Sequence, residues 1–253
     1  GLLIPSGGDA ALALAHHVGA ELPGDADSAP SARFVAEMNR CASELGMRRT
    51  TFRNPDGRDD PGQVTTARDL AIATQALMSH PVLEQLVGTP SLTVHIGGPN
   101  ARRLTLWNTN ALLGSPGVHG VKTGTSDEAG QNLVTAVWRG DARIVLVVLG
   151  GDDRYRATWD LLNILDERFR WVRLGAHGDL PMLQAELDAS GLVFLSARTV
   201  LLSAEQAADL SYDITLEQTT RTSEWQARGA VEFMVRDVSL ATLALYDRGA
   251  GAT

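Results

Sequence analysis

The stretch Gly120-Val121-Lys122-Thr123-Gly124-Thr125 contains the only lysine in this chain of 253 residues. Of the 22 lysine and arginine residues, the other 21 (22 − 1) are therefore arginine. Lysine offers a compact charge with three donors and can lose its proton when it is desolvated, whereas arginine stays charged. The stretch indicates the start of a strand with a functional lysine, against the alternative of a solvated surface lysine.

Two β-branched runs follow this stretch, at residues 132–138 and 143–149. They are joined by Arg139-Gly140-Asp141-Ala142, which predicts a hairpin. Because both runs are almost continuously apolar, we expect them to form central strands covered on both faces. Residues 153–172 then show one helical stripe, whose aromatic residues, Tyr155 among them, are interpreted as packing that helix onto the sheet.

The residues before the lysine stretch alternate between helical and turn patterns. Helices are predicted over the following segments: 9–18, 32–45, 67–79 and a short one after Pro81. The stretch 20–31 is predicted to be a loop, and residues 91–107 suggest a hairpin. Thr66 and Asp69 resemble a capping box, and Cys41 is expected to be a small buried hydrophobe.

The pattern changes near residues 175–181, where short alternating segments replace the longer elements. This change predicts a small β-rich unit of about 70 residues that can form an independent module. We therefore expect two domains, over residues 1–176 and 177–253. The fold class is mixed α/β (α+β), with a central antiparallel sheet between helices and a small C-terminal β-sandwich.

Composition excludes several function classes. The formal charge is −8 and no basic stripe is visible, so nucleic acid is not an expected partner. No apolar run approaches the ~20 residues that a membrane span needs. No paired cysteine motif or His-Glu-x-x-His is present, and neither is a nucleotide-binding glycine loop, so we expect neither a metal nor a cofactor. The chain begins at Gly1 and not at methionine, which we interpret as a fragment or a processed product.

Two segments are candidates for chemistry. Ser6 precedes a predicted helix, where its hydroxyl either caps the helix or relays protons beside an anionic ligand group. Lys122, Thr123 and Thr125 supply a charge and two hydroxyls along a strand edge. Such an edge can pair with the backbone of an extended peptide, and the cation can attract the peptide's carboxylate.

The order of the motifs resembles that of the serine D-alanyl-D-alanine carboxypeptidases, the low-molecular-mass penicillin-binding proteins of peptidase family S11. The matching segments are Leu3-Ile4-Pro5-Ser6-Gly7-Gly8, Phe52-Arg53-Asn54-Pro55-Asp56-Gly57, Thr66-Ala67-Arg68-Asp69-Leu70, Trp107-Asn108-Thr109-Asn110-Ala111-Leu112-Leu113 and Gly120-Val121-Lys122-Thr123-Gly124. The resemblance covers residues 1–175 well and residues 180–250 more loosely.

The resemblance implies roles for individual residues. Ser6 would pass a proton during acyl transfer, and Lys122 would hold the electrostatics of the site and attract the terminal carboxylate of the substrate. Thr123, Gly124 and Thr125 would bind that carboxylate and the substrate backbone. Arg154, or Arg156 as a weaker candidate, would be a further carboxylate-binding arginine.

The resemblance is incomplete at two of the family's three active-site elements, which are Ser-x-x-Lys, Ser-x-Asn and Lys-Thr-Gly. His119 and not serine stands three places before Lys122, so no Ser-x-x-Lys occurs in this sequence. Gly8 stands where the second element has asparagine. We therefore expect the chain by itself to be inactive, although its family consists of enzymes.

The resemblance also implies a setting and partners. The implied substrate is a peptidoglycan stem peptide ending in D-Ala-D-Ala, β-lactams are the implied inhibitors of a full-length parent, and the implied location is extracytoplasmic. Peripheral membrane association is left open, because members of the family often end in an amphipathic helix. Two other functions stay open: a non-catalytic relative that binds cell-wall peptide or a partner, and a β-lactam-hydrolysing enzyme on the same fold, which the β-rich tail disfavours.

Overall fold

The computed structural model describes residues 1–24, 27–217 and 227–248. Parts of the predicted loop 20–31 and of the predicted domain 177–253 therefore lie outside the described residues. The chain divides into two compact units, one of residues 1–138 and 143–161 and one of residues 139–142 and 162–253. The predicted boundary after residue 176 stays a prediction.

The first four helices of the first unit match the predicted segments closely, and the fifth is shorter than predicted. They are α1 (Gly8–Glu21), α2 (Pro30–Glu44), α3 (Ala67–Met78), α4 (Pro81–Val87) and α5 (Arg154–Arg168), the last of which runs on into the second unit. The side chain of Thr66 accepts a hydrogen bond from the Asp69 backbone and so caps α3 as the sequence indicates. None of the helices within the described residues is both long and apolar enough to span a membrane.

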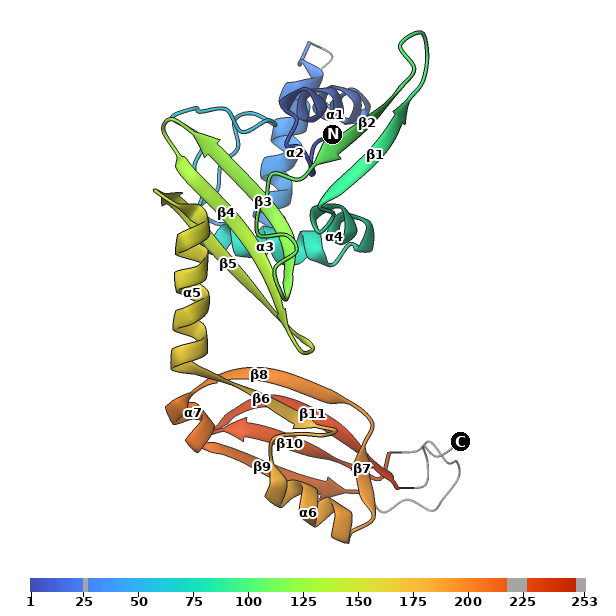
Figure 1. Cartoon of the computed structure of the whole chain (residues 1–253), viewed down its shortest axis with the longest axis vertical. Coiled ribbons are helices and arrows are strands. Elements are labelled where there is room, and N and C mark those ends of the chain that lie inside the picture. Colours follow the sequence, from blue (N-terminus) through green and yellow to red (C-terminus); the bar gives the residue numbers. More distant parts are fainter. Residues whose placement is uncertain (25–26, 218–226, 249–253) are drawn as a thin grey trace. The chain divides into compact units, whose positions relative to one another are not determined.

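The strands of the first unit form two sheets. One is the hairpin of β1 (Ser91–Ile96) and β2 (Arg102–Trp107). The other contains β3 (Val118–Ser126), β4 (Gly130–Arg139) and β5 (Ala142–Gly151), in the order β3-β4-β5. β3 pairs with β4 in antiparallel fashion. Figure 1 shows this three-stranded sheet flanked by helices, as the sequence predicted.

The position of β3 matters for function. Because the order is β3-β4-β5, one side of β3 faces β4 and its other edge has no strand partner among the described residues. Buried side chains of β4, such as Leu133, Ala136 and Val137, hold this sheet in the core of the unit. β3 therefore presents an open backbone edge on a rigid support, which an extended ligand can pair with.

The second unit consists of two sheets around one core. A four-stranded sheet has the order β7-β11-β10-β9, and β6 pairs with β8. The bounds are β6 (Phe169–Gly175), α6 (Pro181–Ala189), β7 (Leu192–Phe194), β8 (Ala197–Ser203), α7 (Ala204–Ala208), β9 (Leu210–Leu216), β10 (Gly229–Val235) and β11 (Val238–Asp247). Leu174 of β6, Phe233 of β10 and Leu245 of β11 share a single buried cluster. This packing is the predicted β-sandwich.

Three sequence predictions were wrong. Of the two runs expected to be central strands, β4 is central, but β5 lies at the end of the order β3-β4-β5 among the described residues. The helix predicted over 153–172 ends at Arg168, because residues 169–175 pair with β8 as a strand. Val172 and Leu174 stand two positions apart and pack on the same core, as in a strand. The distant partner strand decides between the helical and the strand pattern. Cys41 is exposed on α2 and not buried, and Ala42 beside it faces the interior.

Candidate active site

Ser6 and Lys122 meet across 116 positions of sequence. The Lys122 Nζ donates a hydrogen bond to the Ser6 Oγ at 2.6 Å. It donates a second one to the carbonyl oxygen of Thr123 at 2.8 Å. An ammonium has three N–H donors, so the third is available to a ligand.

The segment before α1 is what places Ser6. Ile4 is buried, and its carbonyl oxygen accepts a hydrogen bond from the Thr109 backbone N–H at 3.2 Å. Leu3 packs against a buried cluster that includes Val121, the neighbour of Lys122. Ser6 itself has a φ of 58°, the left-handed region that costs a non-glycine residue of order 1 kcal/mol or more. Such a backbone conformation persists only where the surrounding structure stabilises it. At Ser6 this conformation places the hydroxyl beside the Lys122 ammonium.

The loop after β2 supplies a second hydroxyl. The Asn108 amide donates to the carbonyl oxygens of Val87 and Thr89 at 3.3 and 3.1 Å. The side-chain Oδ1 of Asn108 also accepts from the Asn110 backbone N–H at 2.9 Å. With the loop held in this way, the hydroxyls of Thr109 and Thr123 lie 2.6 Å apart and share a hydrogen bond.

Arg154, at the first position of α5, contacts Gly124 and Thr125 of β3. Its guanidinium donates to the carbonyl oxygens of Gly124 and Asn132 at 2.9 and 3.1 Å. It also donates to Gln131 Oε1 at 3.1 Å and to the Thr125 hydroxyl. Four acceptors of the described chain thus engage four of its five N–H donors. One N–H stays available to a ligand, although Arg154 is only 8% exposed.

These residues surround a hollow of about 410 Å³. Its lining residues are Ser6, Thr109, Thr123, Gly124, Thr125, Gln131, Arg154 and Tyr155. The lining contains hydroxyls, an amide and a guanidinium but no carboxylate. Within the described residues neither Lys122 nor Arg154 forms an ion pair with an acid, so the hollow has a positive potential suited to an anionic group.

The surroundings of Lys122 lower its pKa. Burial lowers the pKa of Lys122 below its ordinary value, and the positive charge of Arg154 lowers this pKa further. Both causes act in the same direction, because burial disfavours any charge and a like charge disfavours a second one. A bound carboxylate would have the opposite effect.

All six residues predicted for the site lie together in the structure. Ser6 contacts Lys122, while Thr123, Gly124, Thr125 and Arg154 line the hollow. The competing candidate, Arg156, has a side chain that is 81% exposed, and its nearest acid is Asp160 at 3.9 Å. Arg154 and not Arg156 lines the hollow, and its role as a carboxylate-binding residue stays a prediction.

Sequence reasoning missed three lining residues: Thr109, Gln131 and Tyr155. Tyr155 was interpreted as a packing residue, yet its hydroxyl donates to the Thr109 carbonyl oxygen at 3.1 Å. The same hydroxyl accepts from the Ala111 backbone at 3.3 Å. The aromatic stripe gave no signal of this role, because the contact between Tyr155 and Thr109 joins residues 46 positions apart in the sequence.

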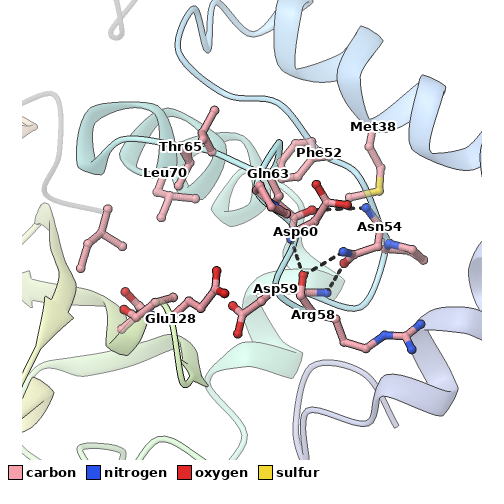
Figure 2. Close-up of a pocket in the computed structure, with 17 residues that line it drawn as sticks. Met38, Phe52, Asn54, Arg58, Asp59, Asp60, Gln63, Thr65, Leu70 and Glu128 are labelled. Atoms are coloured by element: carbon pink, nitrogen blue, oxygen red, sulfur yellow. Dashed lines mark hydrogen bonds between the residues drawn. The ribbon is translucent and has the colours of Figure 1, made fainter.

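A second hollow of about 550 Å³ lies between the loop after Phe52 and the β3–β4 turn. Figure 2 shows that one part of its wall is apolar, with Met38, Phe52 and Leu70, and that Asp59, Asp60 and Glu128 supply carboxylates elsewhere. The Ser126 hydroxyl donates to Asp59 at 2.5 Å and ties the loop to the end of β3. Among the described residues no group of three or more His, Cys, Asp or Glu could hold a metal ion.

Comparison with known proteins identifies a family. The profile of the family described as D-alanyl-D-alanine carboxypeptidase, peptidase S11, matches residues 1–153. The chain is 41% identical over 160 residues to D-alanyl-D-alanine carboxypeptidase DacC of Escherichia coli (strain K12), covering 62% of this chain and 36% of the relative. It is 32% identical over 170 residues to DacF of Bacillus subtilis (strain 168), covering 67% of this chain and 41% of the relative. The matched region thus spans about two fifths or less of these curated relatives.

Solved structures agree with this assignment. Penicillin binding protein 6B from Escherichia coli is 27% identical and superimposes with a TM-score of 0.62, over 96% of this chain and 66% of that one. The Streptomyces K15 DD-transpeptidase is 33% identical with a TM-score of 0.60, over 64% of each chain. The first of these matches extends over both units of the present chain.

Proposed function

Since the chain belongs to the D-alanyl-D-alanine carboxypeptidase family, we propose that it forms the peptide-binding cleft of a serine-type carboxypeptidase that trims peptidoglycan stem peptides ending in D-Ala-D-Ala. The observation that carries the proposal is the 2.6 Å contact between Lys122 Nζ and Ser6 Oγ beside the open edge of β3. A cation, a hydroxyl and an open strand edge are the groups that a C-terminal peptide requires.

The terminal carboxylate of the peptide binds at the hollow beside β3. One N–H of Lys122 and one of Arg154 stay available to it, and the Thr123 and Thr125 hydroxyls lie on the same strand. Charge-assisted hydrogen bonds of this kind are shorter and roughly twice as strong as neutral ones. The backbone of β3 at Gly124 pairs with the peptide and holds it extended.

Ser6 and Lys122 act on protons. In acyl transfer a serine nucleophile attacks the peptide carbonyl, its proton passes to a base, and a proton is later delivered to the leaving amine. The Ser6 hydroxyl both accepts from Lys122 and can donate, so it can relay that proton to the departing D-alanine. The lowered pKa of Lys122 makes the exchange easier, because its neutral form is more accessible.

Residues 1–253 contain no Ser-x-x-Lys element and therefore do not supply its serine nucleophile. Lys122 is the only lysine, and His119 stands three places before it. We infer that the chain by itself binds the peptide without turning it over. β-Lactams, which mimic the peptide and acylate the nucleophile of penicillin-binding proteins, would react only with a parent that carries this element. The expected location is the cell envelope, where the substrate lies.

A second candidate function is binding without cleavage, in a relative that recognises cell-wall peptide or a partner. Gly8 favours it, because glycine cannot supply the side-chain amide that the Ser-x-Asn element would direct at the substrate. The two candidates share the carboxylate cradle and differ only in chemistry. A parent carrying a Ser-x-x-Lys element would support the enzyme.

The test combines binding and turnover. A diacetylated tripeptide ending in D-Ala-D-Ala is titrated into the purified chain by calorimetry, and D-alanine release is followed in parallel. We expect saturable binding without D-alanine release, and Lys122→Met should weaken the binding. Arg156→Met is the matched control and should leave binding unchanged. Steady D-alanine release would overturn the inference of inactivity, and absence of binding would overturn the proposed cleft.

The parent protein provides the complementary test. Labelling with a fluorescent penicillin, followed by mass spectrometry, should place an acyl adduct on a serine of the parent and none on the chain studied alone. An unlabelled parent would favour the binding relative.

A further inference from the structure

One side-chain oxygen holds Arg154 at two of its atoms. Gln131 is the second residue of β4 and lies opposite Thr125 in the register of β3 and β4. Its Oε1 accepts a hydrogen bond from the Arg154 Nε at 3.1 Å and another from the Arg154 backbone N–H at 3.4 Å. The first N–H groups of a helix have no partner within the helix. Gln131 therefore stabilises the start of α5 and orients the side chain that begins there.

The contacts of Arg154 determine which of its N–H groups remains for a ligand. Gln131 engages the Nε, and the carbonyl oxygens of Gly124 and Asn132 engage Nη1 at 2.9 and 3.1 Å. Nη2 donates one N–H to the Thr125 hydroxyl. A guanidinium has five N–H donors in a fixed planar arrangement, so the fifth one lies on Nη2. Because the group is planar, the contact at Nε helps to fix the direction of this N–H.

All the acceptors around the Arg154 guanidinium are neutral. They are an amide oxygen, two backbone carbonyl oxygens and a hydroxyl. Arg154 is only 8% exposed, so solvent ions screen its charge weakly. A buried charge without a counter-ion destabilises a protein, and a ligand of opposite charge offsets this effect. Because Gln131 is an amide and not an acid, the attraction of Arg154 remains available to an anion.

We propose that Gln131 is a positioning residue of the carboxylate subsite: its amide oxygen holds Arg154 with Nη2 toward the terminal carboxylate of the peptide, and its neutrality leaves the guanidinium without a counter-ion until that carboxylate binds. Gln131 thus acts through Arg154 and sets the preference of the cleft for an acid over an amide. This inference rests on the proposed function. A glutamate at position 131 would accept the same hydrogen bonds but would itself be the counter-ion.

Two substitutions separate the acceptor of Gln131 from its neutrality. Gln131→Glu keeps the length and the acceptor but adds a negative charge, whereas Gln131→Met keeps a similar length and removes the acceptor. Gln75 on α3 is exposed and does not line the hollow, so Gln75→Glu is the control for a charge added elsewhere. The wild type and each variant are titrated by calorimetry with a D-Ala-D-Ala peptide that has a free carboxylate and with its C-terminal amide.

The preference for the acid over the amide is the quantity compared. In Gln131→Glu this preference should fall about tenfold or more, because the new carboxylate pairs with Arg154 and repels the carboxylate of the peptide. In Gln131→Met it should fall by a smaller factor, because the charge of Arg154 stays while its orientation is lost. Binding of the amide should stay close to that of the wild type in both variants, and Gln75→Glu should behave as the wild type does.

Thermal unfolding without peptide separates this role from a merely structural one. Because Gln131→Glu gives the buried guanidinium a charged acceptor, its melting temperature should be at or above that of the wild type while its acid preference falls. In an Arg154→Met background Gln131→Glu should instead lower the melting temperature, because the half-buried carboxylate then has no cation beside it. A merely structural contact would lower stability and acid preference together.

The outcomes distinguish this inference from the proposed function. An acid preference equal to that of the wild type in either Gln131 variant would overturn the inference and leave the proposed function intact. A melting temperature of Gln131→Glu that falls along with its acid preference would also overturn the inference, since the substitution would then act by disturbing the fold. Failure of the wild type to bind the acid peptide would overturn both.

Discussion

Lys122→Met tests whether the ammonium contacts the carboxylate of the peptide. Methionine keeps a similar side-chain length but removes the charge and all three N–H donors. In the structure two of these donors bind Ser6 Oγ at 2.6 Å and Thr123 O at 2.8 Å, which leaves one for the ligand. A hydrogen bond to a charged group contributes about 1.5–3 kcal/mol, which corresponds to a factor of about 10–150 in Kd.

The assay compares two ligands, a D-Ala-D-Ala peptide with a free carboxylate and the same peptide as its C-terminal amide. The wild-type chain should bind the acid about 10–150 times more tightly than the amide. In Lys122→Met most of this preference should be lost, while a part that belongs to Arg154 is retained. Calorimetry gives the coupling energy between Lys122→Met and the replacement of the peptide carboxylate by an amide. This energy separates the contact between lysine and carboxylate from general effects of the substitution on folding.

The result that would refute the reasoning is an equal loss for both ligands. Lys122→Met would then weaken the acid and the amide by the same factor, and the lysine would support the cleft without contacting the carboxylate. Lys122→Arg separates charge from shape. Because arginine keeps the charge but cannot deprotonate, it should retain a part of the acid preference.

Three further predictions follow from named contacts. The pKa of Lys122 is lowered in the folded chain. Between this lowered pKa and about 10.4 the unfolded chain therefore binds more protons than the folded chain, and the free energy of unfolding should rise with pH. Thermal unfolding at several pH values should give a steeper rise for wild type than for Lys122→Met, and equal slopes would contradict this. Arg154→Met should weaken binding of the acid peptide at least tenfold and should lower the melting temperature. Arg156 is exposed, so Arg156→Met should change neither quantity, and equal effects of the two variants would contradict the placement of Arg154 beside the hollow. Phe233 is 0% exposed, so Phe233→Ala should lower the free energy of unfolding, measured in urea, by about 3–5 kcal/mol. A decrease under about 1 kcal/mol would contradict the observed packing of Phe233.

Local patterns in the sequence determined most elements of the first unit. The apolar stripes predicted α1 to α4, because a helix imposes its periodicity on neighbouring residues. The β-branched runs on both sides of Arg139–Ala142 predicted β4 and β5, because short apolar runs joined by turn residues are typical of a hairpin. The single lysine and the motif order predicted six residues that the structure brings together, and their role in function stays a prediction.

The tertiary structure decided what depends on distant partners. The helix predicted to reach residue 172 ends at Arg168, because pairing of β6 with β8 supplies hydrogen bonds that periodicity cannot reveal. Arg154 rather than Arg156 reaches the cleft, since the start of α5 directs it beneath β3. Packing likewise makes neighbours of Gly8 and Asp56, which stand 48 positions apart (56 − 8) in the sequence. Sequence thus determined the residue types and local elements, and packing determined which of their side chains share a site.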